Sequence, residues 1–153
     1  MLVVATTADL SAHVGQEVGV SAWREIPESM ILGFGALTDE RHWIHTDAAR
    51  VRRETPFDGL VAHGFLTLAL LTTLGGECLR IEDAPRILNY GIDRLRFTEI
   101  VTAGARIRLR LTLRDMKSVS DGSMRLTWHG VVEVQSKARP ALVCDFLWLI
   151  QPN

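Results

Sequence analysis

The sequence has few cysteines, almost no net charge and no long apolar run, and each shortage excludes a class of protein. Cys78 and Cys144 are far apart and lack the spacing of metal ligands, so we interpret them as small buried side chains in a reducing compartment, or as one disulfide. A formal net charge of −1 gives no electrostatic reason to expect a nucleic acid or an anionic membrane as a partner.

No apolar run reaches the ~20 residues that a membrane-spanning helix needs. The opening segment MLVVATTADL lacks the basic and long apolar regions of a signal peptide. We therefore expect a cytoplasmic protein without a membrane partner. With 153 residues, 47% of them hydrophobic and 23% charged, the chain fits one globular domain over residues 1–153 with a sizeable core.

Helices are predicted mainly in the first half of the chain. Pro27 suits the first turn of a helix whose apolar residues recur at helical spacing, and Gly33 and Gly35 within it indicate close packing. Thr46 or Asp47 can cap a short helix over Ala48–Arg53. The segment Phe65–Leu74 is apolar almost all round, which predicts a helix buried on every side and ending at Gly75-Gly76.

Strands are predicted mainly in the second half, where apolar residues stand at alternate positions. The predicted strands cover residues 18–26, 86–97, 106–114, 124–134 and 142–150. We expect a bulge at Gly91 and a turn at Asp121-Gly122. Helices followed by antiparallel strands indicate an α+β fold in which the sheet surrounds the apolar helix.

Acidic and imidazole side chains gather just before the apolar helix. Four of them lie within nine residues of Leu37, namely Asp39, Glu40, His42 and His45. The apolar helix is directly preceded by the sequence Ala62-His63-Gly64. Catalytic groups commonly sit on loops supported by a rigid element, so we interpret this segment as an active-site loop. An alternative is a metal site made by His42, His45 and Asp47.

Two segments resemble a known family. HWIHTDAARVRRETPFDGLVAHGFLTLALL looks like the hydratase motif of MaoC-like, (R)-specific enoyl-CoA hydratases, and LNYGIDRLRFTEIVTAGARIRLRL resembles the strand region that follows it. The resemblance covers nearly the whole chain and is closest to the small NodN-like members. It implies a hot-dog fold, with an antiparallel sheet wrapped around a long buried helix.

The resemblance also implies roles for individual residues. In the family an Asp stands five residues before the catalytic His; Glu40 occupies that position here, His45 is its partner, and Asp39 is one residue out of register. Gly64 matches the glycine whose backbone N–H contacts the thioester oxygen. The residues implied to line the substrate are Asp39, His63, Thr72, Asn89 and Tyr90.

The expected activity is addition of water across the 2,3 double bond of an enoyl-CoA or acyl-carrier thioester. The expected protein is a homodimer. It needs no cofactor beyond the coenzyme A of the substrate. Two alternatives are a hot-dog acyl-CoA thioesterase and a catalytically degenerate acyl-thioester-binding protein, the second suggested by Glu40 in place of Asp. His63 is expected to brace the loop through hydrogen bonds, and Tyr90 is either a pocket residue or part of the core.

Overall fold

The computed structural model describes residues 1–83, 86–119 and 122–151 of the chain. Asp121 of the predicted turn lies outside the described residues. In chain order the elements are β1 (Leu2–Thr6), the 3-10 helix η1 (Ala8–His13), β2 (Glu17–Val20), β3 (Arg24–Glu25), α1 (Glu28–Thr38), α2 (Trp43–Thr46), α3 (Ala48–Glu54), α4 (Gly64–Ala69), α5 (Leu71–Cys78), β4 (Leu79–Asp83), β5 (Arg86–Phe97), β6 (Arg106–Ser118), β7 (Met124–Val134) and β8 (Leu142–Gln151).

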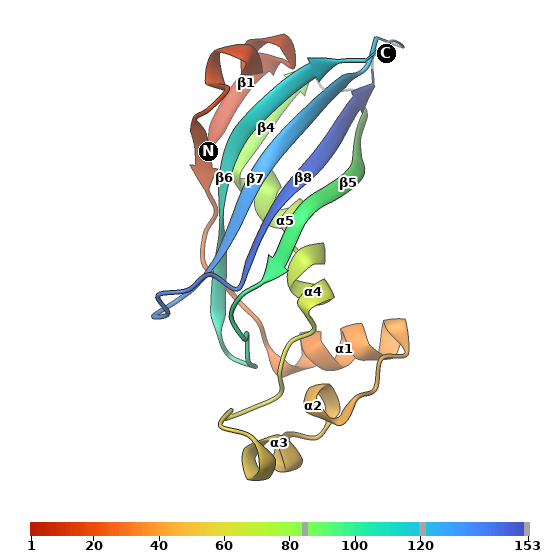
Figure 1. The fold of residues 1–153 in the computed structure, drawn as a ribbon, viewed down its shortest axis with the longest axis vertical. Helices are drawn as coiled ribbons and strands as arrows, with labels where there is room; N and C mark the ends of the chain where they lie inside the picture. Colours follow the sequence, from red (N-terminus) through yellow and green to blue (C-terminus); the bar gives the residue numbers. More distant parts are fainter. Residues whose placement is uncertain (84–85, 120–121, 152–153) are drawn as a thin grey trace.

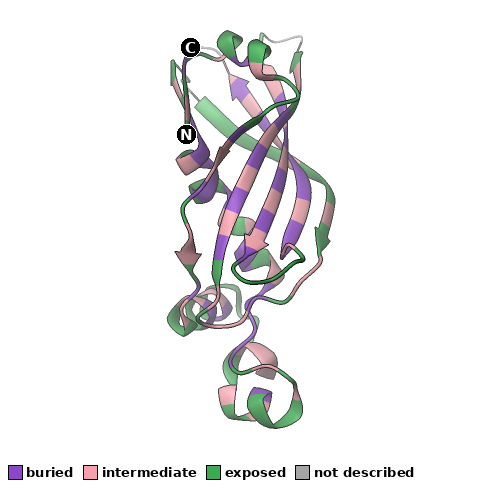
Figure 2. Cartoon of the chain, turned by 90° about the vertical axis from the view of Figure 1, so that its left-hand side faces the viewer, coloured by how far each residue is buried: buried purple, intermediate pink, exposed green. Residues whose placement is uncertain are grey.

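The long strands form an antiparallel sheet in the order β2-β6-β7-β8-β5, and β3 also pairs with β6. Alternate residues of β6, among them Ile107, Leu109 and Leu111, are fully buried, as their spacing predicted. Figure 2 shows the same alternation of buried and partly exposed residues along the neighbouring strands. Burying each such side chain contributes about 1.5–3 kcal/mol.

The helix against the inner face of the sheet is longer than predicted. α4 and α5 meet at Leu70, whose backbone is right-handed helical, and hydrogen bonds from Leu70 N to Leu66 O and from Leu74 N to Leu70 O continue across the junction. The expected end at Gly75-Gly76 is wrong, because Gly75 lies inside α5 and is buried beside Trp148. This glycine continues the helix and does not end it.

The apolar helix is not buried on every side in the isolated chain. Leu66, Leu71 and Leu74 face the core, but Phe65 is 66% exposed. Figure 1 shows α4 leading from α1, α2 and α3, which gather beyond one end of the sheet, to α5 beneath the sheet. The α1–α3 segment therefore lies next to the start of the central helix, which is formed by α4 and α5.

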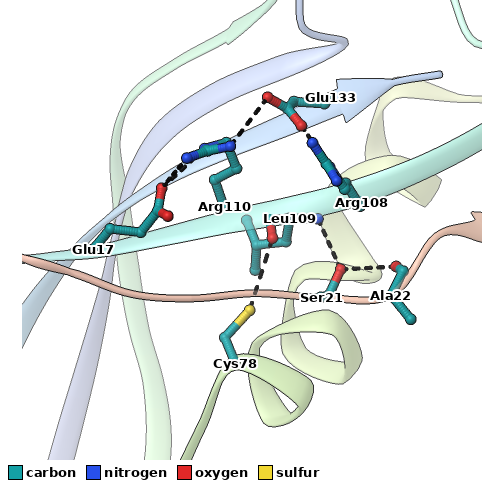
Figure 3. Close-up of polar contacts among 8 residues, drawn as sticks. All are labelled: Glu17, Ser21, Ala22, Cys78, Arg108, Leu109, Arg110 and Glu133. Carbon is teal, nitrogen blue, oxygen red and sulfur yellow. Dashed lines mark hydrogen bonds and ion pairs between the residues drawn. The ribbon is translucent and has the colours of Figure 1, made fainter. Parts of the chain in front are cut away.

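The predicted strand over residues 18–26 is divided into β2 and β3, both paired with β6. Between them, the buried Ser21 hydroxyl accepts a hydrogen bond from Leu109 N at 2.9 Å and donates one to Ala22 O at 3.0 Å (Figure 3). A side chain therefore replaces part of the backbone ladder at the break.

Ion pairs cross the outer face of the same strands. Arg110 pairs with Glu17 at 2.7 Å, and Glu133 accepts from Arg108 at 2.6 Å (Figure 3). Pairs this exposed contribute only about 0–1 kcal/mol each. They connect β6 to β2 on one side and to β7 on the other.

β5 forms one edge of the sheet and pairs only with β8 among the described strands. Its register shifts between Asn89 and Gly91, which confirms the predicted bulge.

A second register shift in β5 surrounds Arg94, whose φ is +53°. The Arg94 guanidinium binds the buried Asp145 carboxylate. Burial raises the pKa of Asp145, but hydrogen bonds from His129 and Arg94 lower it more, so the net pKa is below its usual value.

A small parallel sheet joins β1 to β4, pairing Leu2 with Leu79.

Both cysteines are buried free thiols, so the disulfide alternative is wrong and the interpretation as small buried side chains is confirmed. Burial raises the pKa of Cys78 to about 11 and that of Cys144 to about 12. Among the described residues, no helix is long and apolar enough to cross a membrane.

Candidate active site

α1 ends at Thr38, and its C-cap residue Asp39 adopts the left-handed conformation with φ of +57°. Aspartate tolerates this conformation better than most residues, so it suits the end of a helix. The Asp39 carboxylate accepts a hydrogen bond from Arg41 Nε at 2.8 Å, and its side chain is 83% exposed. The structure therefore directs Asp39 toward Arg41 and solvent.

Glu40 and His45 are joined through the backbone of His42. Glu40 Oε1 accepts a hydrogen bond from His42 N at 3.1 Å, and His42 O accepts one from His45 N at 2.9 Å. The His42 ring in turn caps α2 by accepting from Ile44 N. These bonds place Glu40 and His45 on one short turn.

The His45 imidazole is half-buried and held in one tautomer. Its Nδ1 lies 2.6 Å from the carbonyl oxygen of Val61. A carbonyl only accepts hydrogen bonds, so Nδ1 carries the proton and Nε2 of the neutral ring is a proton acceptor. The sequence identified His45 but not Val61, because a backbone contact across sixteen residues leaves no mark on side-chain identity.

His63 lies against the other side of this histidine. The two rings stack with centroids 3.7 Å apart and an interplanar angle of 22°. His63 is buried, and its ring nitrogens meet no partner at standard hydrogen-bond geometry among the described residues, although the Glu40 backbone acts on the ring as a hydrogen-bond acceptor. The best-defined contact through which His63 braces the loop is therefore the ring stack, with the Glu40 backbone beside it. Burial and the neighbouring His45 lower the pKa of His63, although the nearby Glu40 raises it in part.

Gly35 of α1 provides the space in which these groups meet. A Cβ at this position would lie 2.8 Å from the Glu40 carbonyl oxygen and 3.4 Å from Cε1 of His63. A Cβ at Gly33 would meet nothing within 4 Å. The close packing expected from the two glycines is confirmed at Gly35 and wrong at Gly33.

The two glycines give a matched pair of substitutions. Gly33→Ala is expected to stabilise the protein by up to about 1 kcal/mol, because alanine favours the helix over glycine. Gly35→Ala is expected to destabilise it by about 1–3 kcal/mol, since the added methyl group overpacks the contact with Glu40. Urea unfolding of both variants checks the difference, and equal stabilities would contradict the proposed packing role of Gly35.

Gly64 begins α4, and a Cβ there would lie 3.0 Å from ring atoms of Phe97, so that ring would have to shift by a few tenths of an ångström to accommodate a side chain. The first N–H groups of a helix have no partner within the helix. A cavity of about 160 Å³ lies beside Gly64, lined also by Thr67, Phe97 and Glu99. Thr67 and Phe97 were not among the sequence candidates. Thr67 lies one helical turn after Gly64 on α4, whereas the proximity of Phe97 to Gly64 depends on how β5 packs on α4.

Two larger cavities lie between the central helix and β5, with volumes of about 320 and 220 Å³. Both border Thr72 and Asn89, and Asn89 Nδ2 donates a hydrogen bond to the Thr72 hydroxyl at 3.4 Å. The structure thus brings these two candidates together. Tyr90 is 59% exposed, which excludes the alternative that it belongs to the core of the chain.

The alternative metal site is not formed. Asp47 accepts from Arg50 N and caps α3, while the His42 and His45 ring centroids are 6.3 Å apart with each Nδ1 bonded elsewhere. Within residues 1–83, 86–119 and 122–151, no group of three His, Cys, Asp or Glu side chains is arranged to hold a metal ion.

Comparison with known proteins identifies relatives over most of the chain. The sequence profile described as "MaoC like domain" matches residues 9–134. Nodulation protein N of Rhizobium meliloti (strain 1021) is 35% identical over 147 residues, which cover 95% of this chain and 91% of that protein. The 3-hydroxyacyl-thioester dehydratase Z of Mycobacterium tuberculosis (strain ATCC 25618 / H37Rv) is 34% identical over 140 residues, covering 92% of each chain.

The architecture is also similar to that of solved structures. The MaoC-like dehydratase from Rhodospirillum rubrum superposes with a TM-score of 0.78 at 19% identity, covering 98% of this chain and 99% of that one. At this identity the likeness concerns the fold alone. It confirms the hot-dog arrangement of an antiparallel sheet around a central helix.

Proposed function

The chain belongs to the MaoC-like dehydratase family, and from that membership we propose that it adds water across the 2,3 double bond of a 2-enoyl thioester, with (R) stereochemistry, and catalyses the reverse dehydration. The observation that carries this proposal is the 2.6 Å contact between His45 Nδ1 and Val61 O. It leaves Nε2 of the neutral ring as a proton acceptor next to the Glu40 turn. General acid–base groups of this kind contribute about 10²–10⁴-fold to rate.

The proposed reaction uses Glu40 and His45 as a pair that holds one water molecule. The water oxygen bonds to C3 of the enoyl group, one water proton passes to the pair, and the pair returns a proton to C2. The Gly64 N–H, at the start of α4, is proposed to donate to the thioester oxygen as enolate charge develops there. The thioester bond stays intact, and no cofactor is required beyond the coenzyme A of the substrate.

The acyl group is proposed to occupy the cavities between the central helix and β5. Their lining is mostly apolar, including Leu68, Ile92 and Phe146, with the Asn89–Thr72 hydrogen bond between the two. An apolar lining with few polar groups suits an acyl chain. Coenzyme A and a carrier-bound pantetheine present the same thioester, so the site chemistry is the same for both.

The proposal is tested with a panel of short, medium and branched 2-enoyl-CoAs. We expect loss of the enoyl-thioester absorbance without release of free thiol. Appearance of free thiol would instead support the thioesterase alternative. Binding of the panel without turnover would support the degenerate binding protein that Glu40 suggests.

We propose that the chain forms a homodimer through β5, because an apolar edge strand left unpaired favours association. The exposed large apolar residues on this strand are Ile87, Leu88, Tyr90, Ile92 and Phe97. Light scattering at micromolar concentration is expected to give twice the 17.0 kDa of one chain.

Leu88→Asp is expected to shift the protein toward the monomer, because it places a charge on the proposed edge. Leu37→Asp is the control, since Leu37 is an exposed apolar residue on α1 and not on β5. A wild-type protein that scatters as a monomer would contradict the proposed dimer.

A further inference from the structure

His63 is a buried side chain whose main described contacts are with other rings. It is 5% exposed, and its nitrogens meet no protein partner at standard hydrogen-bond geometry among the described residues, apart from the effect of the nearby Glu40 backbone. Its closest ring contact is the stack on His45, and Phe34 packs on it at 5.1 Å with a tilt of 51°.

We propose that His63 is a positioning residue that fixes the plane of the His45 imidazole through ring stacking and so directs Nε2 of His45 toward the reacting water. This inference rests on the proposed hydration. It gives His63 a role that depends on its flat ring and not on proton transfer by its nitrogens.

A single hydrogen bond does not hold an imidazole in one orientation. The bond from His45 Nδ1 to Val61 O fixes one ring atom, and the ring can still rotate about that contact within the limits of its side-chain torsions. The stacked His63 ring, with its centroid 3.7 Å from that of His45, blocks that rotation because a turned ring would collide with it. Together the hydrogen bond and the stack fix both the position and the plane of the ring.

His63 is itself held by residues of α1. Phe34 and Gly35 come from the same turn of α1, and the gap at Gly35 accommodates both the His63 ring and the Glu40 carbonyl. The same contact region therefore sets the position of the His45 ring and of the Glu40 backbone. Burial and the neighbouring His45 lower the pKa of His63, which favours the neutral form of the stacked ring.

The test compares three substitutions at this position. His63→Phe keeps a flat ring and removes both nitrogens, His63→Gln keeps polar atoms and removes the ring, and His63→Ala removes both. We expect His63→Ala and His63→Gln to lower kcat about 100-fold with KM changed less than about threefold, because the misplaced group takes part only in the chemical step. His63→Phe is expected to keep kcat within about fivefold of wild type. Circular dichroism and thermal melting identify the folded variants.

Histidine side-chain NMR provides a readout that does not depend on turnover. In the wild type, His45 is expected to show the single tautomer protonated at Nδ1, and in folded His63→Gln or His63→Ala its two nitrogen shifts are expected to move toward a tautomeric average. A His45 spectrum unchanged in those variants would overturn the proposal, as would a folded His63→Phe with the activity loss of His63→Ala. If the wild type hydrates no enoyl thioester, the proposed function fails, and the NMR comparison still decides whether His63 orients His45.

Discussion

His45→Ala is expected to lower kcat/KM for 2-enoyl-CoA hydration by roughly 10²–10⁴-fold, the contribution of a positioned acid–base group. The reason is the loss of Nε2, the proton acceptor defined by the bond from Nδ1 to Val61 O. The half-buried ring contributes little to the core, so the fold is expected to remain. Steady-state kinetics with circular dichroism and thermal melting measure the two effects separately.

His42→Ala is the matched control, because His42 is a second histidine on the same turn. Its ring is exposed and caps α2 through Ile44 N. Loss of a cap costs about 1 kcal/mol of stability, and turnover is expected to change little. A folded His45→Ala variant that keeps activity within a few-fold of wild type would contradict the assignment. A large loss in His42→Ala instead would mean that the wrong histidine has been assigned.

Glu40→Gln is expected to lower turnover by at least about 100-fold, because the amide cannot accept a proton. The amide oxygen can still accept the hydrogen bond from His42 N, so the local turn is expected to persist. Asp39→Asn is the control. The Asp39–Arg41 pair is exposed and contributes about 0–1 kcal/mol, so this variant is expected to be nearly wild type.

Glu40→Asp restores the residue that the family resemblance implies at this position. A gain in kcat would show that the longer side chain is a handicap, and a loss would show that the pocket is built around glutamate. The assignment of Glu40 is contradicted if Glu40→Gln retains near-native turnover of a substrate that the wild type hydrates well. Asp39 would then become the candidate carboxylate, despite its contact with Arg41.

The fold was largely predictable where one face of an element is buried. The alternation along β6 predicted its buried residues, and the glycine in β5 predicted its bulge at Gly91. β1 and β4 were not predicted, because each is only five residues long and their parallel pairing joins segments more than seventy residues apart. Gly75 was misread as a helix end, because packing against Trp148 outweighs the helix propensity of glycine there.

The candidate site was predictable at the level of residue identity but not of geometry. The spacing from Glu40 to His45 and the Ala-His-Gly sequence marked the segment. The stack of His63 on His45 depends on how the α1–α3 segment folds against the start of α4, and this is a tertiary contact. The same holds for Val61 O, a backbone atom that sets the His45 tautomer.

The most direct test of the account is turnover of a 2-enoyl-CoA in water labelled with ¹⁸O, with the products analysed by mass spectrometry and chiral separation. We predict (R)-3-hydroxyacyl-CoA with the label on the C3 hydroxyl and the thioester intact. Label in a free carboxylic acid, with release of coenzyme A thiol, would contradict hydration at C3 and show attack at the carbonyl carbon.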